Sequence, residues 1–291
     1  MPRRTLRVIV LRNETAAREG MLTGHGLAML VRNSAGSIMF DTGDSADTWR
    51  NAEALGIDLS EVCCVALSHG HYDHTNGLPA LLKRLGGVMV TAHPAVFEPR
   101  WADRPGGERD YIGPPATRGE LEALGAVFRL SKDAVPVAPG IITTGEVPRV
   151  SDLAPESPHL LVQRPPDASG QVMEDDFADD ISLIARMGEG QVLLTGCAHA
   201  GLVNIVSRAT KLVGRCPVSI AGGTHLAHES EERIAAVARE IYERGVRQVV
   251  PMHCSGERGA DLLEKHFAGE TLRAGIGNTI VADATGRLTI E

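Results

Sequence analysis

At 291 residues, with 43% hydrophobic and 23% charged residues, the chain is long enough to bury one large core, and we expect residues 1–291 to form a single α/β domain. The net charge of -8 argues against a broad basic surface that binds nucleic acid, and the absence of a stretch of about 18 apolar residues argues against a membrane span. The five cysteines are odd in number and irregularly spaced, which favours a reducing compartment over a disulfide scaffold. We therefore expect a soluble, cytoplasmic protein without nucleic-acid or membrane partners, while the sequence leaves open whether it forms an oligomer.

The first part of the chain alternates between strands and helices. Residues 27–32 and 37–40 are apolar runs of strand length separated by a turn sequence, and they predict a hairpin that leads into Asp41. The continuous apolar run at 62–67 is typical of a strand covered on both faces. A further strand is expected at 88–91, and helices are expected at about 45–55 and 78–85.

Two irregular stretches interrupt this alternation. Residues 97–119 contain several prolines and glycines, so we interpret them as an inserted loop that forms a lid or a substrate wall. Residues 165–180 include the acidic run 174–180, which is typical of a solvated loop. In the last third, strands are expected near 191–195, 216–220 and 247–251, and helices near 201–213, 229–244 and 258–267.

Four potential metal ligands follow the buried strand at 62–67 within six residues: His69, His71, Asp73 and His74. The ends of strands are where α/β proteins place ligands, and imidazole and carboxylate groups suit zinc, iron or manganese. Alternate residues of an extended turn point the same way, so His69 and His71 can hold one metal while Asp73 and His74 face a second. Asp41, in the preceding loop, can accept the second ring N–H of a ligating histidine.

The segment Ser68-His69-Gly70-His71-Tyr72-Asp73-His74 resembles the HxHxDH signature of the metallo-β-lactamase superfamily, and Phe40-Asp41-Thr42-Gly43 resembles another of its features. Within that superfamily, five further segments are similar to the dihydropterin-type (ribofuranosyl-aminobenzene phosphate) synthase-like hydrolases. They are residues 24–27, 55–59, 195–201, 222–226 and 251–256. The resemblance implies a four-layer αββα sandwich, with one half before about residue 150 and the other after it.

The resemblance also implies that the second half completes the metal site. His199 lies between a predicted strand and a helix, where the superfamily commonly supplies a ligand, and His253 resembles its last ligand. One metal would be held by His69, His71 and His199, and the other by Asp73, His74 and His253.

Three positions leave alternatives open. Cys197 stands where many members of the superfamily have a metal-bridging aspartate. The thiol either ligates or is an inert buried side chain, and the bridge is Cys197, a carboxylate of the acidic run (Asp176 or its neighbours Asp175 and Asp180) or another group. His225 ends a predicted strand, and it either orients or protonates the substrate, serves as an extra metal ligand, or is structural. His25 has weaker support.

These residues predict a hydrolase in which two divalent cations activate a water for attack on an ester, phosphoester or cyclic small molecule. Zinc is the expected metal, with manganese and iron as alternatives. Asp73 would orient the water or receive its proton, and His225 is the second candidate catalytic residue. The alternative is an iron-dependent oxidative or sulfur-handling enzyme on the same fold, which Cys197 and Cys254 keep open.

Overall fold

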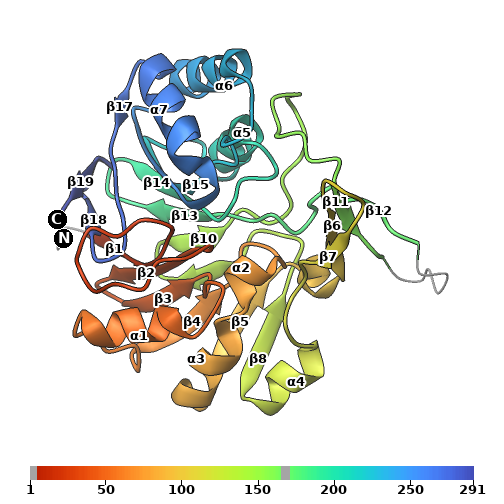
Figure 1. Ribbon diagram of the computed structural model, residues 1–291. Helices are drawn as coiled ribbons and strands as arrows, with labels where there is room; N and C mark the ends of the chain where they lie inside the picture. The colour runs from red at the N-terminus through yellow and green to blue at the C-terminus, as the bar shows by residue number, and fades with distance from the viewer. Residues whose placement is uncertain (1–4, 165–170) are drawn as a thin grey trace.

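The computed structural model describes residues 5–164 and 171–291, and it arranges them as two large sheets with helices on their outer faces (Figure 1). This is the four-layer αββα sandwich that the resemblance implied. The expected division at about residue 150 is wrong, because residues 136–143 join the second sheet and residues 279–290 return to the first. A smaller third sheet projects from one side of the sandwich (Figure 1).

The first large sheet has eight strands in the order β19-β18-β1-β2-β3-β4-β5-β8. Its strands are β1 (Leu6–Arg12), β2 (Ala28–Asn33), β3 (Gly36–Phe40), β4 (Val62–Ala66), β5 (Val88–Ala92), β8 (Ala126–Leu130), β18 (Thr279–Ala282) and β19 (Leu288–Ile290). Because β3, β4 and β5 run parallel, their carboxyl ends meet at one edge of the sheet. The loops that contain Asp41 and His69 begin at that edge.

The second large sheet has seven strands in the order β17-β16-β15-β14-β13-β10-β9. Its strands are β9 (Pro136–Ala138), β10 (Ile141–Thr143), β13 (Leu183–Arg186), β14 (Gln191–Thr195), β15 (Ser219–Gly223), β16 (Gln248–Met252) and β17 (Glu270–Thr271). Strands β14, β15 and β16 are parallel, so the loops with Cys197, His225 and His253 emerge side by side. Parallel pairing therefore brings together residues that are far apart in the sequence.

Helices cover the outer face of each large sheet (Figure 1). In the first half they are α1 (Asp47–Ala54), α2 (Tyr72–Thr75), α3 (Leu78–Leu85), the 3-10 helix η1 (Pro94–Phe97) and α4 (Arg118–Ala123). In the second half they are α5 (Leu202–Val213), α6 (Glu231–Arg244), η2 (His253–Ser255) and α7 (Gly256–His266). Within the described residues, no helix has both the length and the apolar character needed to cross a membrane.

The core is aliphatic and lies in three layers. The central layer fills the space between the two large sheets, and it contains Met29 and Phe40 from the first sheet and Leu194 and Val250 from the second, all fully buried. Two further layers lie between each sheet and its own helices. Burying one such large apolar side chain contributes about 1.5–3 kcal/mol, so the central layer couples the two halves strongly.

The structure also corrects two predictions about individual strands and loops. Residues 97–119 are not an irregular loop, because they contain β6 (Arg100–Asp103) and β7 (Arg109–Tyr111), which join β11 (Leu160–Val162) and β12 (Met173–Glu174) in the third sheet. The strand expected at 216–220 begins later, at Ser219, because Pro217 cannot donate a ladder hydrogen bond. Part of the predicted loop at 165–180, residues 165–170, lies outside the described residues.

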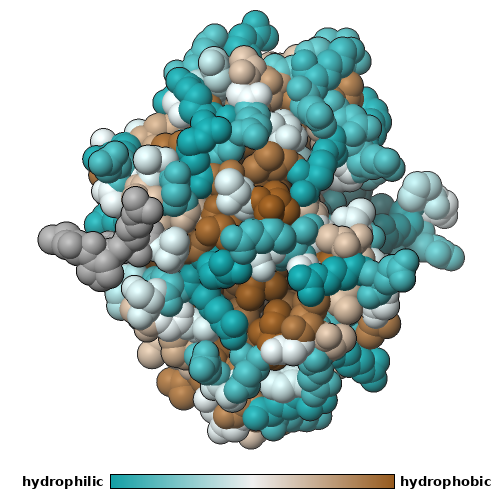
Figure 2. Space-filling model, turned by 90° about the vertical axis from the view of Figure 1, so that its left-hand side faces the viewer, coloured by the Kyte–Doolittle hydropathy of each residue, from teal (hydrophilic) through white to brown (hydrophobic). Residues whose placement is uncertain are grey.

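Figure 2 shows the face of the molecule on the side of β18 and β19. Hydrophobic residues form two areas near the centre of this face, and a band of hydrophilic residues separates them.

Candidate metal centre

A cluster of histidines lies where the carboxyl ends of both large sheets meet. His69 and His71 follow β4, and His199, in the loop after β14, approaches them from the second sheet. We call these three residues the tri-histidine group. Their ring nitrogens lie within 4.8 Å of one another, although His199 is about 130 positions away in the sequence.

The tri-histidine group has the chemistry of a cation site. The Nε2 atoms of all three rings are buried, and none of them has a hydrogen-bond partner. Burial lowers the pKa of His71 to about 3, and it also lowers the pKa of His69 and His199 well below the ordinary histidine value. The rings are therefore neutral, with nitrogen lone pairs that no protein donor satisfies, and such atoms fit a divalent cation.

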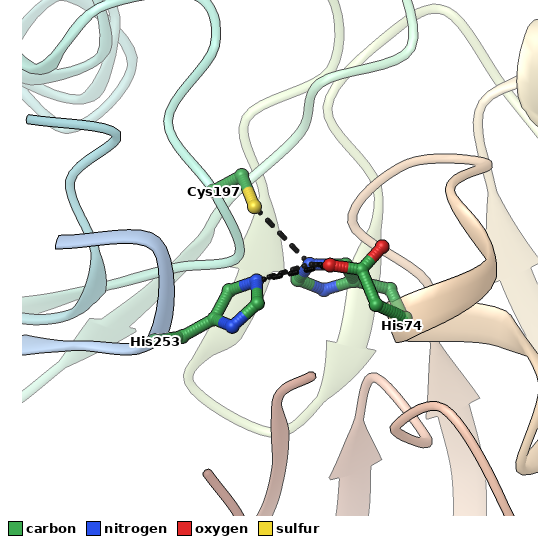
Figure 3. Close-up of side chains that lie close together, drawn as sticks. His74, Cys197 and His253 are labelled. Atoms are coloured by element: carbon green, nitrogen blue, oxygen red, sulfur yellow. Dashed lines mark hydrogen bonds and ion pairs between the residues drawn. The ribbon is translucent and has the colours of Figure 1, made fainter. Parts of the chain in front are cut away.

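A second set of donors adjoins the first. Asp73, His74, Cys197 and His253, which we call the mixed group, have donor atoms within 4.8 Å of one another. His74 Nε2 lies 3.1 Å from Cys197 Sγ and 3.1 Å from His253 Nε2, and the three side chains point toward one another (Figure 3). Asp73 Oδ2 is 3.2 Å from His253 Nε2. The structure therefore brings the six predicted ligands into two neighbouring groups and adds Cys197 to the second.

Hydrogen bonds at the Nδ1 atoms orient several of these histidine rings. Asp41 Oδ2 accepts a 2.7 Å hydrogen bond from His74 Nδ1 and another from Ser68 Oγ, which in turn lies 2.8 Å from His69 Nδ1. These contacts leave the Nε2 atom of each ring free to face the centre. The predicted contact between Asp41 and a histidine of the cluster is present.

Glu14 is a supporting residue that the sequence analysis missed. Its Oε1 atom accepts hydrogen bonds from His253 Nδ1 at 2.8 Å and from His25 Nδ1 at 2.9 Å. Burial alone would lower the pKa of His253, but its hydrogen bonds with Asp73 and Glu14 hold that pKa well above the ordinary value. Glu14 follows β1 in an irregular segment with no motif, so no local signal indicated its role.

His25 lies closer to the centre than its sequence context suggested. Its Nε2 atom is 3.2 Å from Asp73 Oδ2, and hydrogen bonds with Asp73 and Glu14 raise the pKa of His25 to about 9. More than half of the His25 side chain is exposed to solvent. It therefore stands at the mouth of the centre.

His225 and Phe177 pack against the tri-histidine group without joining it. The His225 ring lies 4.2 Å from the His199 ring, centroid to centroid, and the Phe177 ring stacks on the His199 ring at 4.0 Å with nearly parallel planes. His225 Nε2 faces Ser157 Oγ at 3.5 Å. His225 lines the same cleft as members of both groups, and its role stays a prediction. The sequence analysis missed Phe177.

The acidic run supplies support but no member of either group. Asp176 pairs with Arg164 at the surface, where the Asp176 side chain is 60% exposed. Asp175 and Asp179 form ion pairs with the buried Arg100 at 2.8 Å each. Asp180 accepts a 2.7 Å hydrogen bond from the backbone N–H of Ala200, beside His199. Neither Asp175, Asp176 nor Asp180 takes the bridging position, and the interpretation of the run as a wholly solvated loop is wrong.

Backbone strain gathers around the same centre. Among the described residues, five that are not glycine have positive φ: Asp41, Phe177, Ala198, His225 and His253. Each such conformation costs of the order of 1–3 kcal/mol for a side chain of this kind and persists only where the surrounding structure enforces it. All five belong to the centre or adjoin one of its residues, as is typical of functional sites.

A cleft of about 390 Å³ lies over both groups. Its walls include His71, Asp73, Cys197, His199 and His253 of the two groups, together with His225. A cleft of this volume accommodates a small molecule.

Comparisons with known proteins agree with this geometry. The sequence profile of the metallo-beta-lactamase superfamily matches residues 22–209. The 7,8-dihydropterin-6-methyl-4-(beta-D-ribofuranosyl)-aminobenzene-5'-phosphate synthase of Methanocaldococcus jannaschii is 28% identical over 264 residues, which cover 88% of this chain and 89% of that protein. Ribonuclease Z of Thermobifida fusca is 23% identical over 280 residues, covering 87% of this chain and 85% of that one.

A solved structure is similar over nearly the whole chain. It is the crystal structure of a metal-dependent hydrolase of the beta-lactamase superfamily, with a TM-score of 0.80 and 29% sequence identity. The match covers 94% of this chain and 98% of the other.

Proposed function

The chain belongs to the metallo-β-lactamase superfamily and has its metal-dependent hydrolase fold, and from that premise we propose a hydrolase with two divalent cations in its cleft. The tri-histidine group would hold one cation, and the mixed group would hold the other. One observation carries this proposal: buried, neutral histidine nitrogens without partners lie next to a second set of donors. Nitrogen and sulfur donors in sets of three and four favour zinc over manganese.

Bound divalent cations supply Lewis-acid activation of water and offset negative charge on the reacting oxygens of the substrate. Side chains of the protein would orient the water, hold its proton and bind the substrate. Asp73, which is 5% exposed, presents its Oδ2 atom toward the centre, where it can orient a water or hold its proton. His225 stands on the wall of the cleft, where a ring N–H can donate to a substrate oxygen, whereas both ring nitrogens of His25 face the carboxylates of Glu14 and Asp73.

We propose a phosphoester as the substrate class. The outer wall of the cleft contains Arg104, His159 and His228, and these cationic or proton-donating side chains complement a phosphate. Glu156 and Glu229 also line this wall, but Glu229 is paired with Arg233 at 3.2 Å, which reduces its repulsion of an anion. Arg104 pairs with the exposed Asp110 at 2.8 Å, so a bound phosphate would share or replace that carboxylate.

The test combines metal analysis with cleavage assays. Purified protein is expected to bind zinc and to cleave bis(p-nitrophenyl) phosphate, and His69→Ala and His253→Ala are each expected to abolish that cleavage. His266→Ala is a suitable control because His266, on α7, pairs with Glu231 of α6, and neither residue lines the cleft. Unchanged turnover in either ligand variant would show that the ligand set is wrong.

The iron-dependent alternative rests on the sulfur atoms of Cys197 and Cys254, which line the cleft. Stoichiometric zinc or manganese together with the absence of a visible absorption band would exclude it. Bound iron with such a band and no hydrolytic activity would replace the hydrolase proposal.

A further inference from the structure

Two cysteines from different loops meet in the wall of the cleft. Cys197 follows β14 and Cys254 follows β16, so one strand, β15, separates their parent strands. Cys254 Sγ donates a 3.4 Å hydrogen bond to the carbonyl oxygen of Cys197. The two sulfur atoms and a ring nitrogen of His225 lie within 4.8 Å of one another.

The strand between the two cysteines ends in a glycine that allows this approach. A Cβ atom at Gly223 would lie 2.6 Å from Cys254 Sγ and 3.2 Å from Cys197 Cα. Any side chain at this position would therefore push the thiols apart. The backbone N–H of His225 donates to Cys254 Sγ at 3.3 Å and holds that sulfur in place.

Both thiols are reached from solvent through the cleft. Cys254 is partly exposed and Cys197 is buried, and both lie on the wall of the 390 Å³ space. A small oxidant that enters the cleft meets Cys254 first. By contrast, Cys216 is partly exposed at the other end of the second sheet, before β15 begins.

We infer that Cys197 and Cys254 form a reversible disulfide when hydrogen peroxide enters the cleft. Cys254 Sγ attacks one peroxide oxygen, the O–O bond breaks, one water leaves, and the cysteine becomes a sulfenic acid. Cys197 Sγ then attacks that sulfur, the S–O bond breaks, and a second water carries away the remaining oxygen. The two thiols lose two electrons and two protons in total, and hydrogen peroxide is reduced to two waters.

The disulfide would take Cys197 out of the mixed group. Cys197 Sγ lies 3.1 Å from His74 Nε2, and a disulfide sulfur cannot provide the thiolate that binds a cation. This consequence rests on the proposed function, because it requires a cation in the mixed group. Formation of the disulfide does not depend on that proposal.

Peptide mapping tests the disulfide directly. The full-length protein is treated with hydrogen peroxide, once with bound zinc and once after chelation, and is then digested without reductant. We expect a peptide that links Cys197 to Cys254 in the chelated sample, and we expect dithiothreitol to remove it. Cys254→Ser should abolish the link, whereas Cys216→Ser should leave it intact. If peroxide converts Cys254 to a sulfinic acid without any linked peptide in the wild type, the inference is wrong.

Metal analysis tests the consequence separately. Oxidised protein, dialysed against zinc, is expected to bind less zinc than reduced protein. Reduction of the oxidised sample should return its zinc content to that of the reduced protein. Cys254→Ser protein should bind the same amount of zinc before and after peroxide. If the linked peptide forms while zinc content stays constant, the disulfide stands and Cys197 is not a ligand. If no zinc binds even to the reduced protein, the proposed function fails and the disulfide result is unaffected.

Discussion

Replacing Arg100 by methionine removes a buried positive charge and leaves two buried carboxylates without their partner. The Arg100 side chain is 1% exposed, and its guanidinium forms ion pairs of 2.8 Å with Asp175 and with Asp179. It also donates to the carbonyl oxygens of Glu98 at 3.0 Å and Ala95 at 3.1 Å. Methionine retains most of the packing of the aliphatic stem but satisfies none of these acceptors.

The expected loss is about 3–5 kcal/mol of unfolding free energy, the range for removing one partner of a buried ion pair. The lower end is the better expectation, because burial raises the pKa of Asp179 to about 7 against the opposing effect of Arg100, so this carboxyl can take up a proton when its partner is lost. Urea denaturation at neutral pH, followed by circular dichroism, measures the loss. Arg118→Met is the matched control, since Arg118 is exposed, forms a surface ion pair with Glu122 within α4 and lies 6.0 Å over the Phe128 ring.

The same substitution should also weaken metal binding, because Asp179 accepts a 2.8 Å hydrogen bond from the backbone N–H of Gly70, between His69 and His71. Adding Asp179→Asn to the arginine variant should recover part of the lost stability, since one of the stranded charges is then removed. A loss below about 1 kcal/mol in the single variant would mean that the buried ion network contributes no more than a surface pair, and the reasoning would be refuted.

Three further outcomes are expected. Glu14→Ala removes the hydrogen-bond acceptor of His253 Nδ1, so the affinity for zinc, measured by chelator competition, should fall about 10–100-fold. Unchanged affinity would contradict this supporting role. Gly77→Ala places a Cβ 1.9 Å from the carbonyl oxygen of Thr42 and should lower the unfolding free energy by about 1–3 kcal/mol or more, whereas Gly119→Ala, with open space around it, should not. Between about pH 4 and pH 7 the folded protein binds more protons at Asp179 than the unfolded chain, so wild-type stability should fall as pH rises relative to Asp179→Asn, by at most about 1.4 kcal/mol per pH unit; an equal pH dependence in both proteins would count against the raised pKa.

Some residues that form or support the centre have strained backbone conformations, which lower the stability of the fold. Asp41 and His253 both have positive φ, and each carries a hydrogen bond that orients a ring of the mixed group. Relaxing either backbone would rotate a donor away from the centre. The favourable free energy of packing in the central apolar layer therefore offsets the unfavourable free energy of these backbone conformations.

Several features could be predicted from the sequence because their signals are local. The continuous apolar run at β4 predicts a buried strand, and the spacing of His69, His71, Asp73 and His74 places ligands directly after it. The helix α3 was predicted with the same bounds as in the structure, because its apolar residues recur at helical spacing and glycines flank it. Periodicity and turn residues act over a few positions, so one sequence suffices to detect them.

Other features depend on which segments meet, and only the tertiary structure decides that. Glu14 and His253 are 239 positions apart, and they are neighbours because β1 and β16 belong to sheets that share a core. The acidic run was predicted to be solvated because a run of charged residues does not reveal a distant ion-pair partner. In the structure Asp175 is buried in an ion pair with Arg100, which lies 75 positions away in the sequence. Hydrophobic pattern and ligand spacing are properties of short segments. Charge pairing, backbone strain and the contact between Cys197 and Cys254 arise only when the two halves pack together.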